Sequence, residues 1–241
     1  MPPRALDPAG VALVDKPRGP SSFAVVAQIR RSTRARTGHA GTLDPFASGL
    51  LLLLSGRATK LAPWLVGLDK RYLTEIDLSA RTSTGDPEGE VVARQEPPSE
   101  PELVARLERL RGEIELPIPA ASAVKIGGER AYKLARRGVE VEMPLRRSTV
   151  RALDVIACRD GLVTLDLLVS SGTYVRSIAD ALGGHCVTLR RLEVGPFSVE
   201  DAVTPEAFTA ERLLPEAEVL SRIEAAAATA AAADGGGVAP A

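Results

Sequence analysis

The chain has 241 residues, with 30 basic and 31 acidic side chains and a formal net charge of −1. The near-neutral total does not exclude a nucleic-acid partner, because residues 1–198 carry 28 basic and 23 acidic side chains and residues 199–241 carry 2 and 8. The two cysteines lack CxxC spacing, so the sequence indicates neither a zinc cluster nor a disulfide framework. The longest apolar run, Leu50–Leu54, is too short to span a bilayer. With no signal-peptide-like start, the sequence predicts a soluble, cytoplasmic protein without a membrane partner.

The hydrophobic pattern predicts short strands interspersed with amphipathic helices. In chain order we expect a strand at 11–14, helix 23–31, strand 50–54, helix 58–66, a hairpin over 70–94, helix 101–111, strand 123–126, helix 130–137, strands 150–158 and 162–169, helix 174–182, strand 186–194 and helix 204–223. Most strands are joined by short connections without regular βα alternation. This favours an α+β fold with a mixed, largely antiparallel central β-sheet flanked by helices.

The loop over residues 38–49 is the densest candidate for chemistry. Its glycines permit backbone shapes and close approaches that side chains would block. Pro45 disfavours helical geometry at Asp44 and holds this carboxylate extended before the apolar strand. A carboxylate fixed in this way can act as a nucleophile. An Asp-Pro pair also begins ordinary turns, and the loop alone leaves both interpretations open.

Arg176 lies in the first turn of the predicted helix 174–182. A cation at this end of a helix opposes the macrodipole, which indicates an anionic partner nearby. Asp44 is a candidate partner, and the pairing would keep its carboxylate ionised and oriented. A solvated arginine on the helix surface is the alternative.

Aromatic and basic residues lie together elsewhere in the sequence. Tyr72, Tyr132 and Tyr174 each have a basic neighbour, and four arginines, at 30, 31, 34 and 36, precede the 38–49 loop. Rings and guanidinium groups suit bases and phosphates, although each tyrosine alone is typical of packing. No GxGxxG, GxxxxGK[ST] or HExxH motif is present, and we predict neither a metal nor a cofactor.

Several motifs follow one another in a fixed order from residue 11 to about residue 197. They are Asp15-Lys16-Pro17-x-Gly19-x-Ser21-Ser22, Gly38-His39-Ala40-Gly41-Thr42-Leu43-Asp44-Pro45, Lys70-x-Tyr72, Thr82-x-Thr84-Gly85-Asp86-x-x-Gly89, Pro119-x-x-Ser122-Ala123-x-Lys125, Gly172-Thr173-Tyr174-Val175-Arg176 and Leu189-Arg190-Arg191. In this order they closely resemble the bacterial tRNA pseudouridine(55) synthase family, the TruB type of pseudouridine synthase.

The resemblance implies isomerisation of a uridine in the T-loop of tRNA by base flipping. Asp44 would be the nucleophile, attacking either C1′ of the ribose or C6 of the uracil. Tyr72 would stack on the target base and assist removal of the C5 proton, and Arg176 would pair with Asp44. The reaction is redox-neutral and needs no cofactor. A paired-carboxylate glycosidase would need a second acid, and Asp86 fits better as a structural residue.

The resemblance also implies residues that bind the substrate. Tyr174 and Leu189 would line the uracil pocket, and His39 would fill the space left by the flipped nucleotide. Asp86 would hold the network around these groups, and Lys16 would brace the catalytic loop.

The resemblance implies a catalytic domain over 1–198. The composition of the rest predicts an acidic helical C-terminal extension over 199–224 and a disordered Ala/Gly-rich tail over 225–241. The 44 residues after Phe197 are few for the C-terminal PUA domain found in many members, so we expect none. We expect a monomer that binds the tRNA T arm without an obligate protein partner. The alternatives are a tRNA-folding chaperone or a guide-dependent synthase acting on ribosomal RNA.

Overall fold

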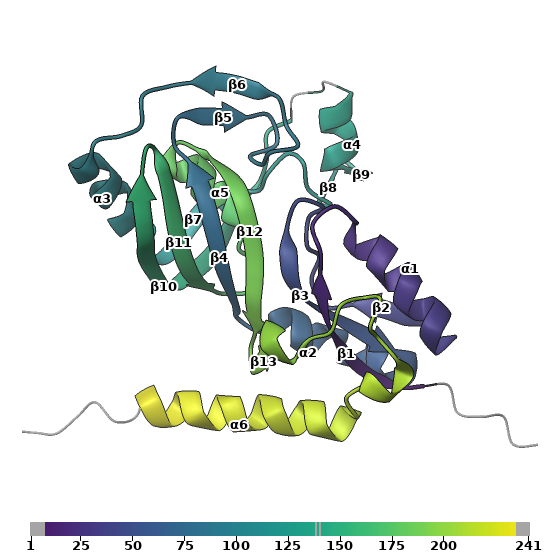
Figure 1. Ribbon diagram of the computed structural model, residues 1–241. Helices are drawn as coiled ribbons and strands as arrows, with labels where there is room; N and C mark the ends of the chain where they lie inside the picture. The colour runs from purple at the N-terminus through teal and green to yellow at the C-terminus, as the bar shows by residue number, and fades with distance from the viewer. Residues whose placement is uncertain (1–7, 138, 140, 235–241) are drawn as a thin grey trace, which may run out of the picture. The chain divides into compact units, whose positions relative to one another are not determined.

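A computed structural model of the protein describes residues 8–137, 139 and 141–234 (Figure 1). The chain packs as two compact units. Unit 1 comprises the residues up to Leu68 and those from Arg191 onward, and unit 2 comprises Asp69–Arg190. Strand β12 (His185–Val194) therefore contributes its first residues to unit 2 and its last residues to unit 1.

Unit 1 is built on the apolar strand β3 (Ser48–Ser55), in which Leu50–Leu54 are buried. Strand β1 (Gly10–Lys16) pairs antiparallel with residues 49–55 of β3, and the short β2 (Thr37–His39) pairs antiparallel with the end of β3. The end of β12 adjoins β3 and also pairs with β13 (Phe197–Ser198). Because successive side chains of a strand point to opposite faces, the burial of all five residues means that both faces of β3 are covered, which explains the continuous leucine run.

Helices cover the strands of unit 1. Helix α1 (Ser22–Thr33) begins where the Ser21 side chain accepts a hydrogen bond from the backbone N–H of Ala24. Residues 58–66, predicted as one helix, form a 3-10 helix (Gly56–Leu61) followed by α2 (Ala62–Gly67). A proline at the start of α2 lacks a backbone N–H, which accounts for this change of helix type.

The C-terminal part of the described chain packs on unit 1. Val11 and Leu214 exchange two backbone hydrogen bonds of 2.9 Å. Short 3-10 helices (Val199–Asp201 and Ala210–Arg212) precede helix α6 (Glu216–Asp234), whose Val219 is fully buried in the core of unit 1. The predicted helix over 204–223 was wrong at its start, because Pro205 and Pro215 interrupt this stretch.

The predicted disorder of residues 225–241 is also corrected where the structure describes them. Helix α6 continues through the alanine run to Asp234, in agreement with the high helix propensity of alanine. Residues 235–241 lie outside the described part of the chain. The functional division at residue 198 stays a prediction.

Unit 2 contains a sheet in which the first part of β12 lies beside β4, followed in order by β11, β10 and β7. The bounds are β4 (Lys70–Asp77), β11 (Leu162–Val169), β10 (Leu145–Arg159) and β7 (Gly112–Pro117). The β4–β11, β11–β10 and β10–β7 pairs are all antiparallel. In β11 every second side chain, from Val163 to Val169, is fully buried, as expected for a strand with one face on a core.

The remaining elements of unit 2 are short. They are the hairpins β5 (Ala80–Thr82)–β6 (Val91–Arg94) and β8 (Lys125–Ile126)–β9 (Glu129–Arg130), and the helices α3 (Glu100–Glu108), α4 (Ala131–Arg136) and α5 (Val175–Leu182). The predicted α+β class and the largely antiparallel sheet are confirmed. None of the described helices is long and apolar enough to cross a membrane.

The packing of α6 on unit 1 is testable at two adjacent positions. Val219 is fully buried and Leu220 is 40% exposed. We expect Val219→Ala to lower the free energy of unfolding by roughly 1–3 kcal/mol, through loss of buried methyl groups and the cavity that they leave. Leu220→Ala is the control, with an expected loss below about 1 kcal/mol. Urea unfolding measures both, and equal losses would contradict the packing of α6.

Candidate active site

The predicted site residues of unit 1 lie in and around the 38–49 loop. Lys16 ends β1 and its side chain is fully buried. Its ammonium group donates hydrogen bonds to the carbonyl oxygens of Ala47 (2.6 Å), Pro17 (2.9 Å) and Pro45 (3.3 Å). An ammonium group has three N–H donors, so it can bind three carbonyl oxygens at once. The buried cation thus ties the loop directly after Asp44 to the end of β1.

A second contact fixes the backbone directly before Asp44. The buried Ser22 hydroxyl donates to the carbonyl oxygen of Leu43 (2.8 Å) and accepts from the backbone N–H of Leu43 (2.9 Å). Asp44 itself closes a turn, since its carbonyl oxygen accepts from the N–H of Ala47 (3.1 Å). The half-buried Asp44 therefore stands between two anchored residues, a geometry suited to a carboxylate that must keep one position.

Arg191, in the part of β12 that belongs to unit 1, is a further anchor of the loop. Its side chain is 1% exposed and donates to the carbonyl oxygens of Leu50 (2.7 Å) and Gly41 (3.2 Å). Gly49 has a φ of 103°, and a Cβ there would clash with the Arg191 backbone. Glycine is therefore required at this position for both conformation and space.

Arg191 was not among the residues predicted for the site, although its side chain is buried. The signal that could have identified it is strand alternation. Leu189 and Arg191 are two residues apart in β12 and both are buried, so they follow the period of one strand face.

His39 lies at the end of β2 and is half-buried. Burial, and secondarily the charge of Arg191, lower the pKa of His39 below its usual 6.5. The ring is therefore neutral at pH 7. Its buried Nδ1 has no hydrogen-bond partner among the described residues. The Phe23 ring meets it edge-on, with centroids 5.3 Å apart and an interplanar angle of 79°.

The predicted residues of unit 2 centre on Arg176, the second residue of α5. The guanidinium group is buried, and it donates to the carbonyl oxygens of Thr84 (2.8 Å) and Ala121 (3.0 Å). It also forms an ion pair with the buried Asp86, with 3.3 Å between Nη1 and Oδ2. Arg176 in the first turn of α5 thus has an anionic partner, as expected, and within unit 2 this partner is Asp86.

Asp86 is held by its own turn. Its Oδ1 accepts hydrogen bonds from the Thr84 hydroxyl (2.5 Å) and the backbone N–H of Glu88 (3.0 Å), and its carbonyl oxygen accepts from the Thr82 hydroxyl (2.7 Å). In the same turn, the carbonyl oxygen of Gly85 accepts a hydrogen bond from the backbone N–H of Cys186 (3.0 Å). This turn therefore fixes the Asp86 carboxylate, which in turn orients the Arg176 guanidinium group and balances its charge.

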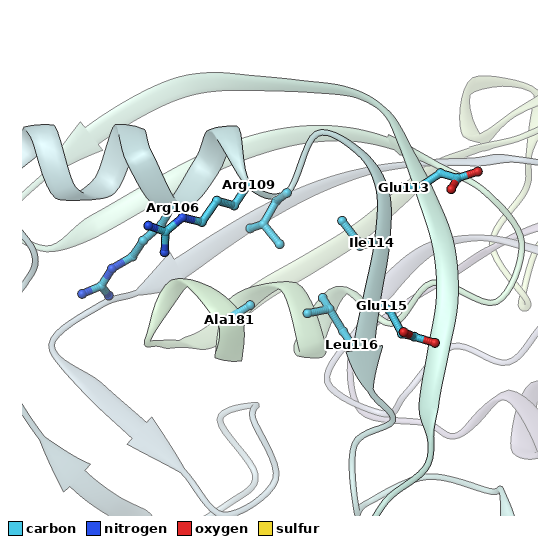
Figure 2. A pocket seen from close by; sticks show the side chains of 8 residues that line it. Arg106, Arg109, Glu113, Ile114, Glu115, Leu116 and Ala181 are labelled. Atoms are coloured by element: carbon cyan, nitrogen blue, oxygen red, sulfur yellow. The ribbon is translucent and has the colours of Figure 1, made fainter.

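The other predicted residues of unit 2 lie on three different elements. Tyr72 is buried on β4, Leu189 is buried on β12, and Tyr174 is half-buried at the N-cap of α5, where its carbonyl oxygen accepts from the N–H of Ser177 (3.0 Å). A cavity of about 290 Å³ in unit 2 contains none of the predicted residues (Figure 2). Its lining comes from α3, β7, α5 and the residues between α3 and β7: Arg106, Arg109, Leu110, Glu113, Ile114, Glu115, Leu116 and Ala181.

Comparison with known proteins shows a family and similar relatives. A family model described as TruB family pseudouridylate synthase (N terminal domain) matches residues 30–175. The chain is 40% identical over 218 residues to tRNA pseudouridine synthase B of Corynebacterium diphtheriae, covering 84% of this chain and 73% of that protein. It is 43% identical over 225 residues to tRNA pseudouridine synthase B of a Ruegeria species, covering 90% and 74%.

A solved structure is similar in fold. A chain in the structure of an H/ACA RNP bound to a substrate RNA containing 2′-deoxyuridine is 25% identical, with a TM-score of 0.61. The match covers 86% of this chain and 54% of the other, so this chain spans about half the length of that relative.

The Arg176–Asp86 pair yields a stability prediction. Asp86→Asn keeps the side-chain shape but removes the charge opposite a buried guanidinium group, and we expect a loss of about 3–5 kcal/mol in the free energy of unfolding. Asp180→Asn is the matched control, because Asp180 pairs with Arg81 on the surface, and its expected loss is below about 1 kcal/mol. Urea unfolding of both variants measures the difference, and a loss below about 1 kcal/mol for Asp86→Asn would contradict the buried pair.

The neutral His39 yields a pH prediction. Its pKa is lowered in the folded protein, so a proton binds more tightly in the unfolded chain. The stability linked to His39 is therefore present above pH 6.5 and is lost as the pH falls through the folded pKa. Urea midpoints between pH 8 and pH 5 should fall less steeply for His39→Gln than for the wild type. Identical pH profiles would show that His39 is not held neutral.

Proposed function

The chain belongs to the TruB family of pseudouridylate synthases, and from this we propose that it is a tRNA pseudouridine synthase, an isomerase that converts the T-loop uridine at position 55 to pseudouridine. The observation that carries the proposal is the anchoring of the 38–49 loop. Lys16 and Ser22 fix the backbone on both sides of Asp44. The names of the bacterial relatives support tRNA as the substrate.

The reaction exchanges two bonds at one ribose carbon. The N1–C1′ bond breaks, the uracil turns, and a C5–C1′ bond forms. One proton leaves C5 and one is gained at N1, so no electrons are transferred. In the proposed mechanism the Asp44 carboxylate attacks either C1′ or C6. Attack at C1′ expels uracil as its N1 anion, whereas attack at C6 bonds the carboxylate to the base before the N1–C1′ bond breaks. In both cases Asp44 is bonded to one fragment, and the other is held by non-covalent contacts while the base turns.

Residues of unit 2 have proposed roles around this carboxylate. Arg176 orients Asp44 and favours its ionised form, while Asp86 holds the guanidinium group in place. Tyr72 stacks on the uracil and assists departure of the C5 proton, and Tyr174 and Leu189 contact the base. The burial of Tyr72 and Leu189 supports these roles, because an apolar lining favours an aromatic base over water.

Base flipping gives His39 its proposed role. Removing a nucleotide from a stacked loop costs a few kcal/mol, and a side chain that fills the vacant space offsets part of this cost. A neutral ring stacks on bases without the need to desolvate a charge, which agrees with the lowered pKa of His39. The edge contact with Phe23 supports the orientation of the ring.

Asp44→Asn tests the proposed chemistry. The amide keeps the size of the side chain but is a poor nucleophile, so we expect pseudouridine formation in tRNA to fall by roughly 10³-fold or more. Binding of tRNA should change little. Asp154→Asn, at an exposed position on β10, is the control and should keep full activity.

The same experiment separates the alternatives. Retained isomerisation in Asp44→Asn would contradict the assignment of the nucleophile. A wild-type protein that refolds tRNA without forming pseudouridine would indicate a chaperone. A wild-type protein that modifies ribosomal RNA only with a guide RNA present would indicate the guide-dependent class.

A further inference from the structure

The segment that contains α1 is strongly basic. From Lys16 to Leu43 the sequence has no aspartate or glutamate. Five arginines of this segment are exposed, at positions 18, 30, 31, 34 and 36. Within residues 8–137, 139 and 141–234, none of the five forms an ion pair with a carboxylate. Their charges are therefore available to an anionic partner.

One side of α1 combines this charge with an aromatic ring. A helix turns about 100° per residue, so Phe23 and Arg30, seven residues apart, point in nearly the same direction. Arg34 lies four residues beyond Arg30, at the C-cap of the helix. The buried residues Val25 and Ile29 point away from it, into unit 1. We call the surface formed by Phe23, Arg30 and Arg34 the α1 flank.

The opposite side of α1 is occupied by an acidic residue. Gln28 points roughly 140° away from Phe23 and donates a hydrogen bond of 3.3 Å to the Glu206 carboxylate. The acidic C-terminal segment thus meets the helix on the side away from the α1 flank. Any anion that approaches the arginines of the flank avoids this carboxylate.

Phe23 is unusual for its exposure. Its side chain is 66% exposed although phenylalanine is among the most commonly buried residues. Its described ring partner is His39, on β2, which lies alongside α1 (Figure 1). Because the contact is edge to face, the two rings together present an open aromatic surface at the start of the basic line.

We propose that the α1 flank is an RNA-binding surface that adjoins His39. Arg30 and Arg34 contact backbone phosphates, and Phe23 stacks on an unpaired base next to the nucleotide that His39 replaces. The inference rests on the proposed function and extends it, because it states where the RNA lies beyond the reacting uridine. Aromatic rings and guanidinium groups together are suited to single-stranded RNA in loops.

Arginines in the last turn of α1 also complement the dipole of the helix. This role would change thermal stability but not the salt dependence of RNA binding. Salt dependence therefore distinguishes the two, because each phosphate contact adds about 0.7–0.9 to the slope of log Kd against log salt concentration.

The first experiment measures tRNA binding between 50 and 300 mM salt for the double variant Arg30→Gln/Arg34→Gln. Arg57→Gln/Arg212→Gln is the matched control, since it removes two exposed charges from another part of unit 1. We expect the slope to fall by about 1.4–1.8 in the flank variant and to change by less than about 0.5 in the control. Equal slopes in the two variants would overturn the phosphate contacts.

The second experiment tests the base contact with a similarly exposed aromatic as control. Phe23→Ala should weaken tRNA binding by about 5- to 150-fold, and Phe23→Trp should restore it. Trp64→Ala should have little effect, because Trp64 is 62% exposed but lies on α2. Unchanged binding in Phe23→Ala would overturn the stacking role.

Pseudouridine formation by the wild type separates the two levels of the proposal. If the wild type modifies tRNA and the flank variants bind tRNA like their controls, only the proposed RNA binding by the α1 flank is overturned. If the wild type neither binds nor modifies tRNA, both the proposed function and the proposed RNA binding by the α1 flank are overturned.

Discussion

The geometry of the candidate active loop depends on two buried cations that are bonded to backbone carbonyl oxygens. Lys16 and Arg191 are almost fully buried, and each donates to carbonyls of the 38–50 segment. Burying a charge is costly unless its donors are satisfied, so both contacts require the loop in one conformation. The position of Asp44 follows from this requirement, since the chain is held on both sides of it.

Unit 2 uses the same principle with a different acceptor. Arg176 also donates to carbonyl oxygens, but a buried carboxylate, Asp86, stands opposite it. The turn around Asp86 is closed by hydroxyl and backbone donors, so the carboxylate and its partner are fixed together. Such buried networks serve orientation more than stability, because desolvation offsets much of the attraction between the charges.

The sequence predicts most elements of this fold because their signals are local. The leucine run of β3, the alternation of β11 and the N-cap of α1 lie within short segments. Strand β7 was missed because its Gly-Glu-Ile-Glu-Leu-Pro sequence contains only two apolar residues and depends on pairing with β10. The late start of α6 does have a local signal, because Pro205 and Pro215 interrupt the helical pattern before Glu216.

The candidate site shows the same limit. Asp44 and Arg176 could be singled out because their neighbours, a proline and a helix start, constrain them locally. The anchoring by Ser22 and Arg191 could not be predicted, because these contacts join residues 21 and 141 positions apart.

The most direct test of the proposed function is site-resolved mapping of pseudouridine in unmodified tRNA after incubation with the purified protein. We expect a single modified uridine, at position 55 of the T-loop, and modification elsewhere or not at all would contradict the proposed function.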